Sequence, residues 1–91
     1  MNVVETDIVI CNQKGLHARA AAAFVKCIND IDAEVLVEKD GQEVDGNSIL
    51  SLLMLAASKG TTVHLKASGN EAQKAIDELT FLINNRFGEE L

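Results

Sequence analysis

The sequence predicts an α+β fold, a two-layer sandwich in which a four-stranded sheet has one face covered by three helices. Residues 3–11 and 61–67 alternate between apolar and polar side chains, which is the period of a half-buried strand. Residues 17–29 and 72–86 repeat apolar side chains at the spacing of an amphipathic helix. The elements follow in the order βαββαβα, and a chain of 91 residues closes only one hydrophobic core. We therefore expect a single domain over residues 1–91.

The first half of the chain is expected to form a strand, a helix and a hairpin. The strand covers Val3–Cys11, and after a turn the helix runs from His17 to about Asn29. The core stripe of this helix falls at positions i, i+3, i+4 and i+7, occupied by Ala21, Phe24, Val25 and Ile28. Residues 33–38 and 42–45 are expected to pair as strands, because the Asp40-Gly41 dipeptide between them is a strong hairpin signal.

A second helix is expected after the hairpin. Asn47 or Ser48 can cap it, and Lys59-Gly60 is expected to end it. Nearly every residue from Ile49 to Leu55 is apolar. This helix is therefore more apolar than one buried face requires.

The last strand and the last helix complete the fold. The strand covers residues 61–67, and its inward-facing side chains are expected to be Val63, Leu65 and Ala67. The helix opens after Gly69-Asn70 and is expected to extend to Arg86, whose charge suits the negative end of a helix. The acidic tail Glu89-Glu90-Leu91 is too short to predict a function from its composition.

Composition and charge exclude several classes of function. The net charge is −6, which argues against binding the phosphate backbone of a nucleic acid and favours encounters with other proteins. The chain shows no export leader, and no apolar run approaches the ~20 residues that a membrane span needs. We therefore expect a cytoplasmic protein without nucleic-acid or membrane partners. Cys11 and Cys27 are expected to be reduced, inert thiols.

The segment Gly15-Leu16-His17-Ala18-Arg19 is the candidate site, because it places an imidazole and a guanidinium at the start of a helix. The first N–H groups of a helix have no internal partner and form a ready anion site. The same positive potential favours the neutral imidazole, which can act as a nucleophile toward phosphorus. Arg19 can neutralise phosphoryl oxygens, and Gly15 lets the backbone come close. On these five residues alone, the alternative is that His17 only caps the helix and Arg19 is a solvated charge.

Other sites receive little support from the sequence. His64 lies on the polar face of a strand without a cationic neighbour, so we expect it to face solvent. The cysteines and histidines fall in no spacing typical of zinc, so neither a metal nor a cofactor is expected. No Ser, His and Asp set and no glycine-rich nucleotide loop can be assigned.

Two motifs resemble those of one known family. The segment from Gly15 to Ala21, followed by Phe24-Val25, closely resembles the active-site segment of the histidine-containing phosphocarrier family (HPr) of the bacterial phosphoenolpyruvate phosphotransferase system. Asn47–Leu55 resembles the second helix of that family, and the similarity extends from the first strand to Arg86. One departure is Ala20, where the family commonly has proline.

The resemblance implies both a topology and a role. It implies an open-faced sandwich with antiparallel sheet order 1-4-2-3. It also implies that His17 accepts phosphate on Nδ1 from the phosphohistidine of an Enzyme I type protein and passes it to an Enzyme IIA type domain. Arg19 would take part in this transfer, and Gly15 and Ala18 would support the phosphate. The protein would then be a carrier and not an enzyme.

The same resemblance suggests where partners act. The family can carry a regulatory phosphoserine at the position of Ser48, written by a dedicated serine kinase/phosphorylase, and the alternative is that Ser48 is a helix cap. Apolar residues around His17 are expected to form an exposed docking patch on a monomer, made of Ala20, Ala23, Leu50, Leu53 and Met54. The alternative is that Leu52, Leu53 and Met54 belong to the core, and we expect one or two of these three to be exposed.

Two other functions remain open at this point. A regulatory module on the same scaffold would use the phosphorylation state of His17 to signal nitrogen or carbon status instead of feeding sugar import. The apolar second helix, the acidic balance and the residue at Ala20 resemble the nitrogen-related branch of the family. A ligand-sensing module without phosphotransfer would need a pocket between sheet and helices, which the plain core does not suggest.

Overall fold

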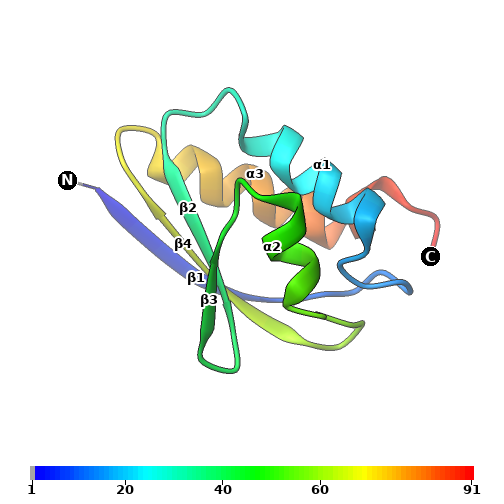
Figure 1. Cartoon of the computed structure of the whole chain (residues 1–91). Helices are drawn as coiled ribbons and strands as arrows, with labels where there is room; N and C mark the ends of the chain where they lie inside the picture. Colours follow the sequence, from blue (N-terminus) through cyan, green and yellow to red (C-terminus); the bar gives the residue numbers. More distant parts are fainter. Residues whose placement is uncertain (1) are drawn as a thin grey trace.

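A computed structural model describes residues 2–91 and arranges them as one sheet with helices on one side (Figure 1). The elements in chain order are β1 (Val3–Val9), α1 (Ala18–Ile28), β2 (Glu34–Lys39), β3 (Gln42–Asp45), α2 (Ile49–Met54), β4 (Thr62–Ser68), α3 (Ala72–Asn84) and a short 3-10 turn, η1 (Arg86–Gly88). The predicted order βαββαβα is confirmed. Within the described part of the chain, no helix has the length and apolar character to cross a membrane.

The sheet is antiparallel throughout and has the strand order β1-β4-β2-β3. Strand β1 pairs with β4 along its whole length, from Val3 opposite Ser68 to Val9 opposite Thr62. Strands β2 and β3 form the predicted hairpin, and Asp40-Gly41 turns the chain with φ values of 51° and 83°. Two successive positive φ values match the right-handed twist of the flanking strands. The topology implied by the resemblance is therefore confirmed.

The core lies between the sheet and the helices. On β4 the side chains of Val63, Leu65 and Ala67 are buried, as the alternation predicted, and Phe24 on α1 and Leu79 on α3 pack over the same face. Each of the larger side chains contributes roughly 1.5–3 kcal/mol by leaving water. The opposite face of the sheet carries polar and charged side chains and has no helix over it (Figure 1).

Helix α2 is shorter than predicted. It ends at Met54 and not at Lys59-Gly60, because Ala56 takes a positive φ of 52° and turns the chain out of the helix. The Lys39 ammonium group donates to the carbonyl oxygens of Leu55 and Ala56, which satisfies acceptors that the ended helix leaves unpaired. The early end brings the following segment back toward the start of α1.

The C-terminal segment also departs from the prediction. Helix α3 ends at Asn84, and Arg86 and Phe87 both have positive φ values of 56° and 55°. The side chain of Phe87 is buried, which folds the tail back over the molecule. The N–H of Gln13 then donates to the carbonyl oxygen of Leu91, so that the tail lies beside the loop that precedes α1 (Figure 1).

Candidate functional site

A tight turn at Gly15 fixes where α1 begins. Gly15 has a φ of 67°, and a Cβ at this position would lie 2.6 Å from the carbonyl oxygen of Ala57. Both the backbone conformation and the close approach therefore require glycine. The N–H of Leu16 donates to the same carbonyl oxygen at 2.8 Å, which fastens the turn to the segment after α2.

His17 is the N-cap residue of α1, with an extended backbone, but its side chain makes no capping hydrogen bond. His17 therefore caps the helix through its backbone and not through its imidazole. The first intrahelical hydrogen bond runs from the N–H of Ala21 to the carbonyl oxygen of His17. The N–H groups of Ala18, Arg19 and Ala20 consequently have no carbonyl partner inside the helix and carry its positive end. The predicted placement of His17 at a helix N-terminus is confirmed.

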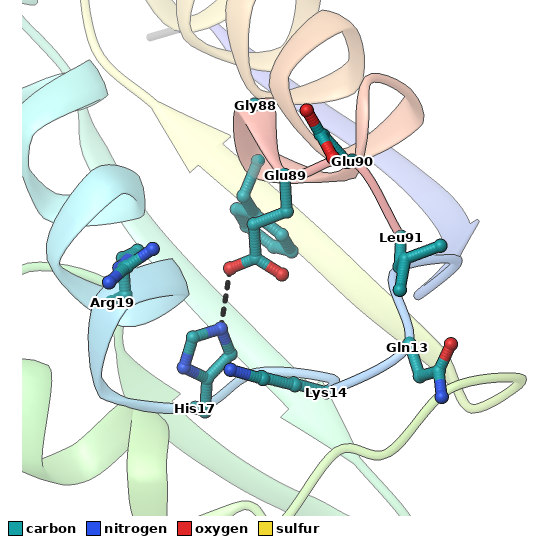
Figure 2. A pocket seen from close by; sticks show the side chains of 9 residues that line it. Gln13, Lys14, His17, Arg19, Gly88, Glu89, Glu90 and Leu91 are labelled. Atoms are coloured by element: carbon teal, nitrogen blue, oxygen red, sulfur yellow. Dashed lines mark hydrogen bonds and ion pairs between the residues drawn. The ribbon is translucent and has the colours of Figure 1, made fainter.

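The imidazole of His17 faces a carboxylate from the other end of the chain. Its Nε2 lies 2.5 Å from Oε2 of Glu89, and Figure 2 shows Nδ1 turned away from this contact. Nδ1 has no hydrogen-bond partner within residues 2–91. The side chain of His17 is 27% exposed and that of Glu89 is 14% exposed. One ring nitrogen is therefore engaged by Glu89, and the other has no partner within the described residues.

Asn12 holds the second oxygen of Glu89. Its side chain is fully buried, and Nδ2 donates to Oε1 of Glu89 at 3.0 Å and to the carbonyl oxygen of Gly15 at 2.7 Å. Burial acts to raise the pKa of Glu89, but the hydrogen bonds from Asn12 and His17 and the charge of Lys14 outweigh it. The pKa of Glu89 consequently lies below its ordinary value. Glu89 is thus a carboxylate at neutral pH.

An open hollow of about 510 Å³ surrounds this contact, lined by Gln13, Lys14, His17, Arg19, Phe87, Gly88, Glu89, Glu90 and Leu91. In Figure 2 the basic side chains of Lys14 and Arg19 lie on either side of the His17 ring. Arg19 is exposed and makes no ion pair or hydrogen bond with other parts of residues 2–91. The hollow therefore combines a ring nitrogen without a partner, a helix N-terminus and an unengaged guanidinium, and the last two are groups that can bind a small anion such as phosphate.

Comparison with known proteins identifies the family. A family model described as "PTS HPr component phosphorylation site" matches residues 4–85. The chain belongs to the HPr family. The phosphocarrier protein HPr of Cupriavidus necator is 41% identical over 87 residues, which cover 96% of this chain and 98% of that protein. The phosphocarrier protein NPr of Shewanella violacea is 35% identical over 89 residues, 98% of each chain.

A solved structure agrees with this assignment. The crystal structure of an HPr from Thermoanaerobacter tengcongensis superposes with a TM-score of 0.92 at 42% identity, and the match covers 97% of this chain and 99% of that one. The HPr relatives of this chain are phosphocarrier proteins, and this chain is accordingly a carrier in phosphoryl transfer.

The predicted docking patch of this HPr protein is only partly exposed. On α2 the side chains of Leu50 and Met54 are 69% and 65% exposed. Ile49, which was not predicted in the patch, is 42% exposed. Leu53 and Ala23 are half-buried and pack against the core. Of Leu52, Leu53 and Met54, Met54 is exposed, so the expectation that one or two of these three are exposed is met.

Ala20 was wrongly expected in the patch, because its side chain is fully buried. Ala20 lies one helical turn before Phe24, on the face of α1 that packs into the core. The buried stripe of α1 therefore includes Ala20, whereas Val25, which was predicted in the stripe, is half-buried.

Ser48 is the N-cap of α2. Its Oγ accepts a hydrogen bond from the N–H of Ser51 at 3.1 Å, which is the capping role that the sequence left open. The hydroxyl is half-buried at the edge of the helix that carries Leu50 and Met54.

The remaining candidate residues lie away from the hollow. His64 is on the helix-free face of the sheet, as predicted, where it contacts Glu5 and Asp7. Cys11 and Cys27 are both free thiols, and burial and the charge of Glu78 raise the pKa of Cys27. Within residues 2–91, no group of three His, Cys, Asp or Glu side chains could hold a metal ion.

Sequence reasoning missed three residues of the site, namely Asn12, Lys14 and Glu89. Asn12 and Lys14 lie in the turn before His17, where polar residues are common and carry no special signal. Glu89 reaches the site only because the chain reverses after α3. The apolar Phe87, two residues from Glu89, is the one sign in the sequence that the tail folds back.

Proposed function

We propose that His17 is the residue that carries the phosphoryl group, on Nδ1, and that this group comes from the phosphohistidine of an Enzyme I type protein and goes to an Enzyme IIA type protein. The observation that supports this is the position of the ring. Of the two histidines in the chain, His17 lies at a helix N-terminus beside an unengaged arginine, whereas His64 lies between two carboxylates.

The transfer exchanges one N–P bond for another. The lone pair of His17 Nδ1 forms a bond to phosphorus while the bond from phosphorus to the donor imidazole breaks, and its electron pair returns to the donor nitrogen. Arg19 and the free N–H groups at the start of α1 offset the charge of the phosphoryl oxygens. Because the site is an open hollow, the phosphoryl group is held loosely and keeps a high transfer potential.

Phosphoenolpyruvate-dependent labelling tests this proposal. The protein is incubated with phosphoenolpyruvate and its cognate Enzyme I, and the added phosphoryl group is measured by intact mass. We expect the wild type and His64→Ala to gain one acid-labile phosphoryl group and His17→Ala to gain none. Acid-labile label that persists in His17→Ala would disprove the assignment.

A second candidate function is regulatory, and the similarity to an NPr protein over nearly the whole chain supports it. In this case the phosphorylation state of His17 signals nitrogen or carbon status instead of feeding sugar import. Transfer rates from the phosphorylated protein to a sugar-specific and to a nitrogen-related Enzyme IIA protein distinguish the two functions. Faster transfer to the nitrogen-related protein would favour regulation.

The further expectations about this protein remain predictions. They are that it acts as a cytoplasmic monomer without a cofactor, and that a serine kinase/phosphorylase modifies Ser48.

A further inference from the structure

The contact between His17 and Glu89 joins residues that lie 72 positions apart in the chain. Three anchors hold the tail in place for it. The side chain of Phe87 is buried, Leu91 accepts a hydrogen bond from Gln13, and Asn12 donates to Glu89. Phe87 and Leu91 anchor the chain before and after Glu89, and Asn12 binds its side chain. These contacts together hold the carboxylate against the imidazole.

A carboxylate selects one form of a neutral imidazole. The neutral ring carries its proton on either Nδ1 or Nε2, and the nitrogen without the proton has the lone pair that can attack phosphorus. An ionised carboxylate only accepts hydrogen bonds. Glu89 therefore favours the form of His17 with the proton on Nε2, which leaves the lone pair on Nδ1.

We propose that Glu89 is a positioning residue that holds His17 in the Nε2–H form and so presents Nδ1 as the nucleophile. This inference rests on the proposed function, because it concerns the nitrogen that His17 uses for phosphoryl transfer. The chain thus recruits its own C-terminal segment to orient the reacting ring.

The charge changes of the transfer support this role. When Nδ1 bonds to phosphorus, the ring gains positive charge because the proton stays on Nε2, and the donor ring loses the same charge as its N–P bond breaks. No proton needs to move. Glu89 lies against Nε2 and offsets the positive charge as it forms, in the way that a buried aspartate orients and stabilises the histidine of a hydrolase triad.

Asn12 keeps the carboxylate in the correct orientation. Its Nδ2 binds Oε1 of Glu89 and leaves Oε2 for His17. The same Nδ2 also binds the carbonyl oxygen of Gly15, so one buried amide links the tail to the turn that begins α1. These two hydrogen bonds satisfy the buried Nδ2 group, whereas the buried Oδ1 of Asn12 has no hydrogen-bond partner within residues 2–91.

Nitrogen NMR of the unphosphorylated protein tests the role of Glu89 directly. With ¹⁵N-labelled histidine, the two ring nitrogens report which of them carries the proton. We expect nearly all neutral His17 rings of the wild type to be in the Nε2–H form, and Glu89→Ala to lower this share toward that of a free histidine side chain. His64 serves as an internal reference, because its contacts are with Glu5 and Asp7 on the other face of the sheet.

Phosphoryl transfer provides the second measurement. We expect Glu89→Ala to accept the phosphoryl group from phosphorylated Enzyme I about tenfold more slowly than the wild type, because the variant loses one charge-assisted hydrogen bond. Glu89→Gln keeps the size of the side chain but removes its charge. Its transfer rate should lie between those of the wild type and Glu89→Ala. The matched control is Glu43→Ala, which removes an exposed carboxylate on β3, outside the hollow, and should change neither measurement.

An unchanged proton distribution on His17 in Glu89→Ala, or faster transfer by this variant, would overturn the inference. The second result would mean that the carboxylate repels the incoming phosphoryl group. The NMR measurement needs no phosphorylation, so it separates this inference from the proposed function. A wild-type protein that takes no label would overturn the proposed function, whereas the proton distribution would still decide whether Glu89 orients the ring.

Discussion

Asp7 and His64 lie directly opposite each other on β1 and β4, and Oδ1 of Asp7 is 2.6 Å from Nδ1 of His64. Glu5 contacts the other ring nitrogen, Nε2, at 2.7 Å. Hydrogen bonds to Glu5 and to Asp7 raise the pKa of His64 above its ordinary value. The helix-free face of the sheet therefore carries a histidine that is charged over a wider pH range than a free one.

This cluster predicts how stability depends on pH. Because the folded-state pKa of His64 is raised, its stabilising contribution is present in full below the unfolded value of about 6.5 and is lost as the pH rises through the folded-state value. We expect a lower melting temperature at about pH 8.5 than at about pH 6. The effect should be small, because the side chains are well exposed. In His64→Gln the difference in melting temperature between the two pH values should be smaller. A difference equal to that of the wild type would mean that other groups cause the pH dependence.

Replacement of Gly15 tests the turn that positions His17. Gly15→Ala should lower the free energy of unfolding by about 2 kcal/mol or more, because it adds backbone strain and a clash with Ala57. Gly60→Ala is the matched control, since Gly60 also has a positive φ, of 90°, but has open space around it. Denaturant unfolding should show a larger loss for Gly15→Ala. Equal losses would mean that the close approach to Ala57 contributes nothing.

The unengaged guanidinium of Arg19 should matter for transfer and not for folding. We expect Arg19→Ala to slow phosphoryl transfer roughly tenfold or more, because it removes a charge that offsets the phosphoryl oxygens. The melting temperature should stay nearly unchanged, since Arg19 is exposed and makes no contact that the fold needs. Arg19→Lys keeps the charge and should recover part of the rate. An unaltered rate in Arg19→Ala would show that the residue has no part in transfer.

Two substitutions at Ser48 separate its structural role from a regulatory one. Ser48→Ala removes the cap of α2 and should cost about 0.5–2 kcal/mol of stability. Ser48→Asp retains a capping oxygen, so it should fold normally, but its charge beside the exposed face of α2 should weaken acceptance of phosphate at His17. If Ser48→Asp transfers phosphate as fast as the wild type, Ser48 serves only as the cap of α2.

The exposed apolar residues of α2 should bind partners. Leu50→Ser and Met54→Ser should each raise the KM of Enzyme I for this protein severalfold while leaving the melting temperature nearly unchanged, because both side chains are mostly exposed. Phe81→Ser on α3 removes a similarly exposed apolar side chain, 71% exposed, and serves as the control. A KM that rises equally in all three variants would indicate no specific patch.

The sequence predicted those parts of the structure that depend on residues close together in the chain. The alternation on β4, the hairpin at Asp40-Gly41 and the position of His17 at a helix start all follow from local patterns. The length of α2 was overestimated, because the positive φ of Ala56 has no sign in the residue type. The resemblance supplied the strand order, which local patterns do not determine.

The site was predicted incompletely for a related physical reason. His17 and Arg19 are close in the chain, so their spacing shows that they share a helix end. Glu89 reaches His17 and Arg19 only because two distant segments of the chain are in contact, and a periodic sequence pattern does not predict such a contact. The burial of Ala20 likewise depends on how closely α1 packs against its neighbours.

The sheet order also bears on self-association. It leaves β1 and β3 at the two edges, where unpaired backbone groups could template pairing with another copy. Strand β3 has only four residues and carries Glu43 and Asp45, and β1 carries Glu5 and Asp7. With a net charge of −6, copies that approach edge to edge bring like charges together.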